Sequence, residues 1–401
     1  MVFDGITPAP PDAILGLTEA FKKDPSPNKV NLGVGVYIDE SGTTPILKSV
    51  RKAEQIILDQ ETTKSYLPIS GSPEYGDHVQ QMIFGKGHAV ISAARCRTAH
   101  TPGGTGALRV GAELARKFVP SAKVWLSAPT WPNHAGVFAA AGRKIEEYPY
   151  YSSTNRELDF DRMLDGLKKI PRNDIVVLHV CCHNPTGVDL EVGQWHEVAR
   201  VAKQNQWIPF LDFAYQGLGQ GLAGDRVGLL SMLETGLDCL IASSFSKNFG
   251  LYNERVGALT VVAKDSASAE AVFSHLKATV RVIYSNPPAH GGLIVNTIFK
   301  NPDLVKLWES EVDGMRNRIA SVRTMFVDHL RKHGATMDFS FINRQRGMFS
   351  FSGLTDAQVK YLREKKSVYM VGGGRINVAG ITSKNIDYLC DSIVEAMRNC
   401  P

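Results

Sequence analysis

The sequence lacks any long apolar segment, which argues against a membrane-spanning helix. No run of about 18 or more apolar residues occurs, whereas a helix that crosses a bilayer needs about 20. No internal repeat or low-complexity tract stands out either. The 401 residues, 43% of them hydrophobic and 21% charged, are typical of a globular protein with two or three domains, or with one large domain and a smaller one.

Clusters of basic residues are also missing. The net charge of +5 is spread over the whole chain, without the Lys/Arg block that binds nucleic acid or anionic lipid. We therefore predict no nucleic-acid partner and no membrane partner. A mild positive excess favours anionic small molecules, although a solvated surface explains it equally well.

Neither a cysteine pair of metal-binding spacing nor a secretory signal is present. The six cysteines include no CxxC pair, and the adjacent Cys181 and Cys182 lie in an apolar run, as expected of buried thiols in a reducing compartment. Residues 1–11 lack the basic start and apolar middle of a secretory signal and the Arg-rich character of a transit peptide. We predict a cytoplasmic protein and leave open a mature organellar form.

Between residues 101 and 286 the sequence alternates strand-like and helix-like segments. Near-continuous apolar strands between helices indicate an α/β fold whose parallel sheet is covered by helices on both faces. The strands are predicted at residues 123–127, 174–182, 207–212 and 239–244, and the helices at 105–118, 194–204 and 227–234.

The pattern of predicted helices and strands changes near residue 302, which predicts a second, smaller domain. A long amphipathic helix is expected at residues 302–333, followed by mixed helix and strand and a final helix at 383–398. At the other end of the chain, the proline-rich residues 7–11 predict an extended arm, and residues 12–22 predict a short helix.

Lys247 and Asp212 lie at the ends of two predicted strands, where an open parallel sheet has its ligand crevice. A lysine that is partly desolvated there can lose its proton and attack an aldehyde. A buried Asp212 would need a cationic partner, such as the protonated pyridine nitrogen of pyridoxal phosphate. Tyr215, three residues on, could reach the ring hydroxyl of that cofactor. Taken singly, Lys247 also fits a surface lysine, and Asp212 a cap of the following turn.

A phosphate site is indicated by residues 101–107, Thr-Pro-Gly-Gly-Thr-Gly-Ala, which open a predicted helix. Glycines let the backbone approach a phosphate, and the helix N-terminus supplies free N–H groups. Ser244 and Arg255 could add a hydroxyl and a guanidinium to the same phosphate. A plain turn into a helix is the alternative explanation.

Residues 182–187, Cys-His-Asn-Pro-Thr-Gly, place Asn184 at a strand end, where its amide could donate a hydrogen bond into the site; as a generic signal the segment is only a turn. His179, Cys181 and His183 are expected to share one face of the strand by period two. Zinc could bind such a face, but the carboxylate and cysteine-pair spacing of zinc sites is missing. We therefore prefer core packing or a supporting polar role, and we predict no metal.

Two arginines lie in polar or glycine-rich surroundings, Arg281 ahead of residues 284–288 and Arg375 within residues 372–377. Arginine binds carboxylates bidentately. One arginine would suit the α-carboxylate of any amino acid, and a second would select an acidic side chain. Each arginine taken alone also fits a structural role.

Together these segments resemble the class I aminotransferases of the aspartate aminotransferase group. The resemblance runs nearly end to end, from residues 14–17 and 31–37 to residues 375–380. The run SSFSKNFGLYNERVG at residues 243–257 is especially specific, as are HNPTG, DFAYQG and YSNPPAHG.

The resemblance implies fold type I of the pyridoxal-phosphate enzymes, in which a large domain with a mostly parallel sheet between helices joins a smaller α+β domain. The implied division is an N-terminal arm at residues 1–12, a large cofactor-binding domain at 45–302, and a small domain made of 13–44 and 303–401. A homodimer with shared active sites is also implied.

Most of the matching residues are implied to hold pyridoxal phosphate. Lys247 would be the Schiff-base lysine and the general base for the Cα proton, with Asp212 and Tyr215 as its catalytic partners. His134 would support Asp212 from behind, and Trp131 would stack on the ring. The implied cofactor-binding residues are Lys247, Gly104, Thr105, Trp131, His134, Asn184, Asp212, Tyr215, Ser244, Arg255 and, from the neighbouring subunit, Tyr66.

A smaller set is implied to bind the substrate. Arg375 would hold the α-carboxylate, and Arg281 would cross the dimer interface to read the distal carboxylate. Gly35 belongs to a segment that would close over the substrate beside Trp131 and Asn184. The implied reaction is a ping-pong exchange of the amino group between aspartate or glutamate and 2-oxoglutarate or oxaloacetate.

Substrate preference is less sharply indicated, because aspartate-type and aromatic-type members share both arginines. Thr105 and Asn286 follow the aspartate-type pattern. The departures from the commonest pattern are Ile38, Ser65 and Gly372–Gly374. We expect a preference for aspartate, with aromatic or broad specificity as the alternative.

Two alternatives belong to other classes of protein. Residues 219–224 fit GxGxxG, the dinucleotide fingerprint of NAD-dependent dehydrogenases, but that pattern needs a strand immediately before it, and residues 212–217 intervene. A non-catalytic binding protein on the same fold would be expected to lose a reactive residue. Lys247, Asp212 and Arg375 are all present.

Overall fold

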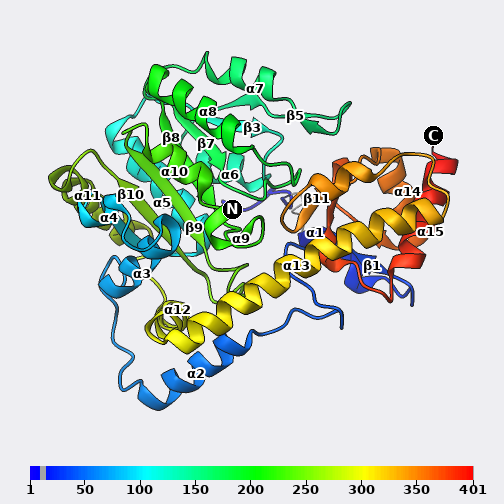
Figure 1. The fold of residues 1–401 in the computed structure, drawn as a ribbon, viewed down its shortest axis with the longest axis horizontal. Coiled ribbons are helices and arrows are strands. Elements are labelled where there is room, and N and C mark those ends of the chain that lie inside the picture. The colour runs from blue at the N-terminus through cyan, green and yellow to red at the C-terminus, as the bar shows by residue number, and fades with distance from the viewer. Residues whose placement is uncertain (10–14, 401) are drawn as a thin grey trace.

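A seven-stranded sheet is the largest feature of the computed structural model, which describes residues 1–9 and 15–400 (Figure 1). The strand order is β2-β10-β9-β8-β7-β3-β4. Neighbouring strands run parallel except at β10, which is antiparallel to both β2 and β9. The strands are β2 Cys96–Pro102, β3 Val124–Ala128, β4 Ile145–Pro149, β7 Ile175–His179, β8 Ile208–Phe213, β9 Cys239–Ser244 and β10 Val256–Val262. The predicted α/β class with a mostly parallel sheet is confirmed.

Side chains of the sheet alternate between two apolar cores, because successive residues of a strand point to opposite faces. In β7, Ile175 and Val177 join the core that contains residues of α5 and α6. Val176 and Leu178 join the core on the other face, with residues of α8 and α10. The helices around the sheet are α3 Pro73–Phe84, α5 Gly103–Phe118, α6 Asn133–Ala140, α7 Phe160–Leu167, α8 Val192–Asn205, α10 Val227–Leu233 and α11 Ser266–Ile283.

The long helix α13, Pro302–Lys332, joins the sheet region to a second group of elements (Figure 1). Its first half places Trp308 in the core of the sheet region. Its second half places Phe326 in a separate apolar cluster that also contains Val30 from the N-terminal part of the chain. This cluster supports the smaller domain expected from the sequence, whose boundaries stay a prediction.

The second group combines short strands with helices from both ends of the chain. Strand β1 pairs in parallel with β12, and β11 pairs antiparallel with β13. The elements are α1 Leu15–Lys23, β1 Val30–Asn31, the 3-10 helix η1 Ser340–Arg344, β11 Phe349–Phe351, α14 Asp356–Lys366, β12 Val368–Tyr369, the 3-10 helices η2 Gly372–Gly374 and η3 Val378–Gly380, β13 Arg375–Asn377 and α15 Ile386–Asn399. The remaining elements are α2 Lys48–Gln60, α4 Ala89–Ser92, β5 Tyr151–Ser152, β6 Glu157–Leu158, α9 Gly221–Gly224 and α12 Ala289–Lys300.

The predicted helices and strands are present, β9 with the predicted bounds and the others with shifted ends, and one prediction at the end of β7 is wrong. The strand expected at residues 174–182 stops at His179, and Cys182 then adopts a left-handed φ of 53°. Cys181 and His183 therefore lie beyond the strand and do not share a strand face with His179. Strands β2, β4 and β10 were not predicted.

Part of the predicted N-terminal arm and the first residues of the helix expected at 12–22 lie outside the described residues; α1 spans Leu15–Lys23. Across residues 1–9 and 15–400, none of the helices combines the length and the apolar character that a bilayer crossing requires.

Candidate active site

A cavity of about 260 Å³ lies at the carboxyl-terminal ends of the parallel strands. The segments that follow β2, β3, β7, β8 and β9 supply most of its wall, as expected for an open α/β sheet. The lining residues are Gly35, Gly104, Thr105, Leu108, Trp131, His179, Asn184, Asp212, Ala214, Tyr215, Ser244, Ser246, Lys247, Tyr252, Arg255, Phe349 and Arg375.

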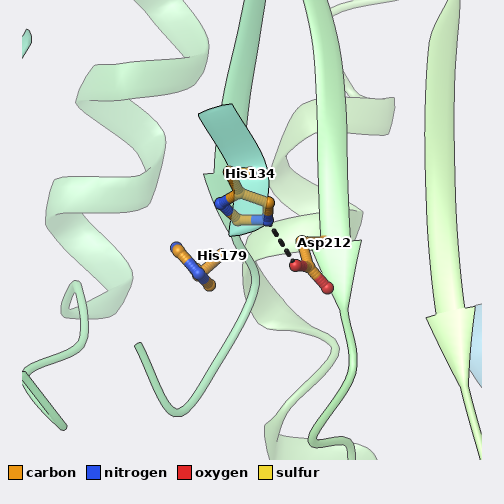
Figure 2. Close-up of side chains that lie close together, drawn as sticks. All are labelled: His134, His179 and Asp212. Atoms are coloured by element: carbon orange, nitrogen blue, oxygen red, sulfur yellow. Dashed lines mark hydrogen bonds and ion pairs between the residues drawn. The ribbon is translucent and has the colours of Figure 1, made fainter. Parts of the chain in front are cut away.

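A buried carboxylate faces this cavity and is held from behind by an imidazole. Asp212, near the end of β8, lies 2.9 Å from Nε2 of His134 on α6 (Figure 2). Burial would raise the pKa of Asp212, but the hydrogen bond and charge of His134 outweigh it and hold the pKa below its ordinary value. The structure favours a role in the cavity over the alternative that Asp212 caps the following turn, because the side chain is buried and bound to His134.

Lys247 lies three residues after the end of β9, with its amine exposed to the cavity. Its Nζ lies 5.1 Å from the ring centroid of Tyr215. Burial lowers the pKa of Lys247 to about 8, since removing water disfavours the charged amine; Asp212 opposes this shift and Arg255 adds to it. The amine is therefore partly neutral near pH 8 and can act as a nucleophile or base.

An anion cradle is formed where α5 begins. The N-cap is Pro102, which has no hydrogen-bonding side chain, so the first N–H groups of the helix stay available for a ligand. A Cβ at Gly103 would collide with the guanidinium of Arg255, and a Cβ at Gly104 would lie 3.1 Å from Cβ of Ser244. The glycines thus let the helix N-terminus, the guanidinium and the hydroxyl converge.

A chain of polar contacts leads from the ring of Tyr215 to Arg375. The amide nitrogen of Asn184 donates to the hydroxyl of Tyr215 at 3.3 Å. The amide oxygen of Asn184 accepts from Nη1 of Arg375 at 3.4 Å, and Nη2 of Arg375 donates to the carbonyl of Gly33 at 2.8 Å. The guanidinium lies 4.4 Å from the ring centroid of Phe349. Within the described residues, the buried Nε of Arg375 has no hydrogen-bond partner.

Several independent features of the cavity fit pyridoxal phosphate. The buried anion Asp212 suits a protonated ring nitrogen, the amine of Lys247 suits an aldehyde, and the cradle at α5 suits a phosphate. The incompletely bonded, buried guanidinium of Arg375 suits a carboxylate.

Three residues that the sequence predicted for the site do not line this cavity. His134 lies behind Asp212, as expected for a supporting residue. Tyr66 is 92% exposed, and Arg281 is exposed on α11, where it donates to the hydroxyl of Ser285 at 2.5 Å. A single chain therefore does not bring Tyr66 and Arg281 to its own cavity.

Other lining residues were not singled out from the sequence. Ser246 and Tyr252 belong to the specific run at residues 243–257, so that run was a usable signal for both. Nη1 of Arg255 donates to Ser246 at 3.4 Å and to the carbonyl of Tyr252 at 2.8 Å. Phe349, in contrast, carries no local sequence signal for its position beneath Arg375.

His179 lines the cavity beside Asp212 and His134 (Figure 2). One ligand atom from each of the three lies within 4.8 Å of the others, which is a spacing that a metal ion could use. His134 is already bonded on both sides, to Asp212 at 2.9 Å and to the hydroxyl of Thr130 at 2.8 Å. Burial lowers the pKa of His179 to about 3. We assign the support of Asp212 to His134 alone, because neither ring nitrogen of His179 has a hydrogen-bond partner among the described residues; the absence of a metal stays a prediction.

The glycine pattern at residues 219–224 does not form a dinucleotide turn. Strand β8 ends at Phe213, well before the pattern, and α9, Gly221–Gly224, has only four residues. The carboxylate of Asp225 instead accepts hydrogen bonds from the N–H groups of Gly217, Gly219 and Gln220. The backbone donors that would bind a pyrophosphate are therefore already used.

The chain is similar over its whole length to enzymes of one family. The family model "Aminotransferase class I and II" matches residues 27–393. The aspartate aminotransferase of Escherichia coli (strain K12) is 51% identical over 396 residues, which cover 99% of this chain and 100% of that protein. The aromatic-amino-acid aminotransferase of Pseudomonas aeruginosa is 44% identical over 393 residues, 98% of each chain.

Solved structures agree with these comparisons. The crystal structure of an aromatic-amino-acid aminotransferase from Burkholderia pseudomallei, covalently bound to pyridoxal phosphate, superposes with a TM-score of 0.96 at 45% identity and covers 99% of both chains. The aspartate aminotransferase from the cytoplasm of Saccharomyces cerevisiae gives a TM-score of 0.97 at 35% identity and covers 100% of this chain and 99% of that one.

Proposed function

The chain belongs to the class I and II aminotransferases and is a pyridoxal-phosphate-dependent transaminase, and on that premise we propose that it exchanges the amino group between aspartate or glutamate and 2-oxoglutarate or oxaloacetate. The observation that carries the proposal is the meeting of Lys247, Asp212 and Arg375 in one cavity. An amine, a ring-nitrogen partner and a carboxylate receptor are the groups that amino transfer to an α-keto acid requires.

In this proposal each reactive residue of the cavity has its own chemical role. When bound, pyridoxal phosphate supplies an aldehyde and an electron-withdrawing ring that makes the Cα proton of an attached amino acid acidic. Lys247 carries that proton, because an amine with a pKa of about 8 can both accept and release it near neutral pH. Asp212 holds a proton at the ring nitrogen, and His134 keeps Asp212 ionised and oriented.

Positioning falls to the rest of the cavity. Arg375 binds the α-carboxylate through its guanidinium, which Gly33 and Phe349 fix in place. Gly104, Thr105, Ser244 and Arg255 would hold the phosphate at the N-terminus of α5. Trp131 would cover the ring, and Asn184 and Tyr215, which contact each other, would reach the ring hydroxyl. Gly35 lies at the edge of the cavity, where a segment can close over the substrate.

Aspartate is the preferred substrate in this proposal, and broad activity that includes aromatic amino acids is the second candidate. The similarity to the Escherichia coli aspartate aminotransferase supports the first, and the similarity to aromatic-amino-acid aminotransferases supports the second. The test is the ratio of kcat/KM for aspartate to that for phenylalanine and tyrosine with one keto acid. A ratio of one or below would overturn the preference for aspartate.

We also propose a homodimer in which Tyr66 and Arg281 complete the cavity of the neighbouring subunit. Both side chains are exposed and lie outside the cavity of their own chain. Val282 and Ile283, next to Arg281, are exposed as well, and a subunit interface would bury such apolar side chains. Sedimentation of the purified protein tests the assembly, and a fully active monomer would contradict it.

A further inference from the structure

Two histidines one helical turn apart face two aspartates one helical turn apart, outside the cavity described above. His329 lies in the last turn of α13 and His333 is the C-cap of that helix, while Asp387 and Asp391 lie in the first half of α15. Side chains at positions i and i+4 of a helix lie on one face, so each helix presents a pair to the other. None of the four residues lines the active-site cavity.

Two of the three contacts among these side chains converge on one carboxylate oxygen. Oδ1 of Asp387 lies 2.9 Å from Nδ1 of His329 and 3.3 Å from Nε2 of His333. The other ring nitrogen of His333, Nδ1, lies 2.6 Å from Oδ1 of Asp391. His329, His333 and Asp387 thus bring three ligand atoms within 4.8 Å of one another.

The two separations from Oδ1 of Asp387, 2.9 and 3.3 Å, are close to the edges of a tetrahedral zinc site, and the ligand atoms of the two imidazoles lie within 4.8 Å of each other. Zinc bonds of about 2.0–2.1 Å to imidazole and carboxylate ligands place neighbouring ligand atoms about 3.3–3.4 Å apart. Small side-chain rotations are therefore enough to admit an ion between His329, His333 and Asp387. Asp391 would remain on Nδ1 of His333, the position of the carboxylate that orients a zinc-bound histidine and fixes its tautomer.

The three side chains are accessible to solvent, so an ion can enter and a water molecule can take the fourth coordination position. The side chain of Asp387 is 70% exposed, and those of His329 and His333 are 26% and 21% exposed. The apolar cluster below, which includes Leu330 of α13 and Leu389 of α15, holds the two helices in register. The ligand backbones are thus set by packing before any ion arrives.

We propose that His329, His333 and Asp387 form a binding site for Zn²⁺ or a similar imidazole-binding divalent ion, which ties the end of α13 to the start of α15. Two imidazoles and one carboxylate suit zinc, nickel, copper or cobalt, whereas magnesium and calcium prefer an all-oxygen shell. The alternative is a set of exposed His–Asp ion pairs, which would contribute little to stability.

The experiment measures Zn²⁺ binding to the cofactor-loaded enzyme, prepared without a histidine tag and treated with a chelator, by isothermal titration calorimetry. The expected result is one saturable site per subunit and a thermal midpoint that rises with Zn²⁺ concentration. His329→Asn or His333→Asn should each weaken binding by at least about tenfold. The matched control is His196→Asn, at an exposed histidine of α8, which should bind Zn²⁺ like the parent.

A Co²⁺ spectrum distinguishes this site from a thiol site. Histidine and carboxylate ligands give weak d–d bands in the visible region, whereas thiolate ligands add a strong charge-transfer band in the near ultraviolet. Cys400 is the one cysteine of the described residues that is not buried, so Cys400→Ser serves as a second control. Saturable binding that persists in both histidine variants, His329→Asn and His333→Asn, a thiolate band lost in Cys400→Ser, or no saturable Zn²⁺ binding would each overturn the proposal.

Discussion

Nε2 of His134 lies 2.9 Å from the carboxylate of Asp212, while Nδ1 of the same ring lies 2.8 Å from the hydroxyl of Thr130. Both nitrogens of His134 are therefore engaged, and the ring cannot turn away from Asp212 without losing both contacts. The imidazole and the ionised carboxylate act as one unit, and the carboxylate is left facing the cavity.

Replacing Asp212 with asparagine should lower kcat/KM for aspartate by at least about a hundredfold, because a neutral amide cannot stabilise a protonated ring nitrogen. The fold should survive, since asparagine keeps the shape and can still contact His134. The control is Asp165→Asn, on the exposed surface of α7, which should retain parental kinetics. Steady-state kinetics measure both variants, and a loss below about tenfold in Asp212→Asn would argue against its role at the ring nitrogen.

The amine of Lys247 should react at a lower pH than an ordinary lysine. Burial lowers its pKa from 10.5 to about 8, so its neutral fraction falls about tenfold for each pH unit below 8 and levels off above it. Competitive acylation of the cofactor-free protein, read by peptide mass spectrometry, should give a midpoint near pH 8.

Lys366 provides an internal comparison for this measurement in the same digest. A hydrogen bond to Glu395 raises the pKa of Lys366 above 10.5, so its acylation should still be rising at pH 10. A Lys247 profile that follows that of Lys366 would contradict the depressed pKa.

The reactive part of the site was predictable because the chemistry follows from local sequence at strand ends. Asp212 lies near the end of apolar strand β8 and Lys247 three residues after apolar strand β9, and the parallel arrangement brings such ends to one edge. The antiparallel direction of β10 was not predictable in the same way, because strand pairing depends on partners far along the chain. Phe349 reaches Arg375 only through the packing of β11 against β13.

The contacts of the His–Asp cluster, His329, His333, Asp387 and Asp391, were likewise not predictable from local sequence. The four-residue spacing of His329 and His333, and of Asp387 and Asp391, is visible in the sequence. That the two pairs face one another depends on how α13 packs against α15, which local sequence does not specify.

Arg375→Lys should damage binding of α-carboxylates more than it damages the fold. Lysine keeps the charge but cannot form the two parallel hydrogen bonds of a guanidinium. Its single amine would also lose the hydrogen bond to either Gly33 or Asn184 that Arg375 makes. We expect kcat/KM for aspartate to fall by about a hundredfold or more. A primary amine without an α-carboxylate should react equally slowly with both proteins, measured by single-turnover absorbance of the cofactor. A matching loss for that amine would show that Arg375→Lys disturbs the cavity in general.

Mixing two inactive variants should restore activity if Arg281 serves the neighbouring subunit. Lys247→Ala removes the reactive amine but keeps Arg281, and Arg281→Ala removes the distal-carboxylate receptor but keeps Lys247. In a mixed dimer, one site combines Lys247 of one chain with Arg281 of the other and is complete, while the second site lacks both. Random reassociation makes half of the dimers mixed, so aspartate turnover should recover to about a quarter of the parental value.

The control for this recovery is each variant refolded alone. It should stay inactive toward aspartate, which excludes contamination by parental enzyme. If Arg281 acted within its own chain, each mixed dimer would contain one subunit without Lys247 and one without Arg281, and turnover would not rise above that of Arg281→Ala alone. Its exposed position on α11, away from the cavity of its own chain, leads us to expect complementation.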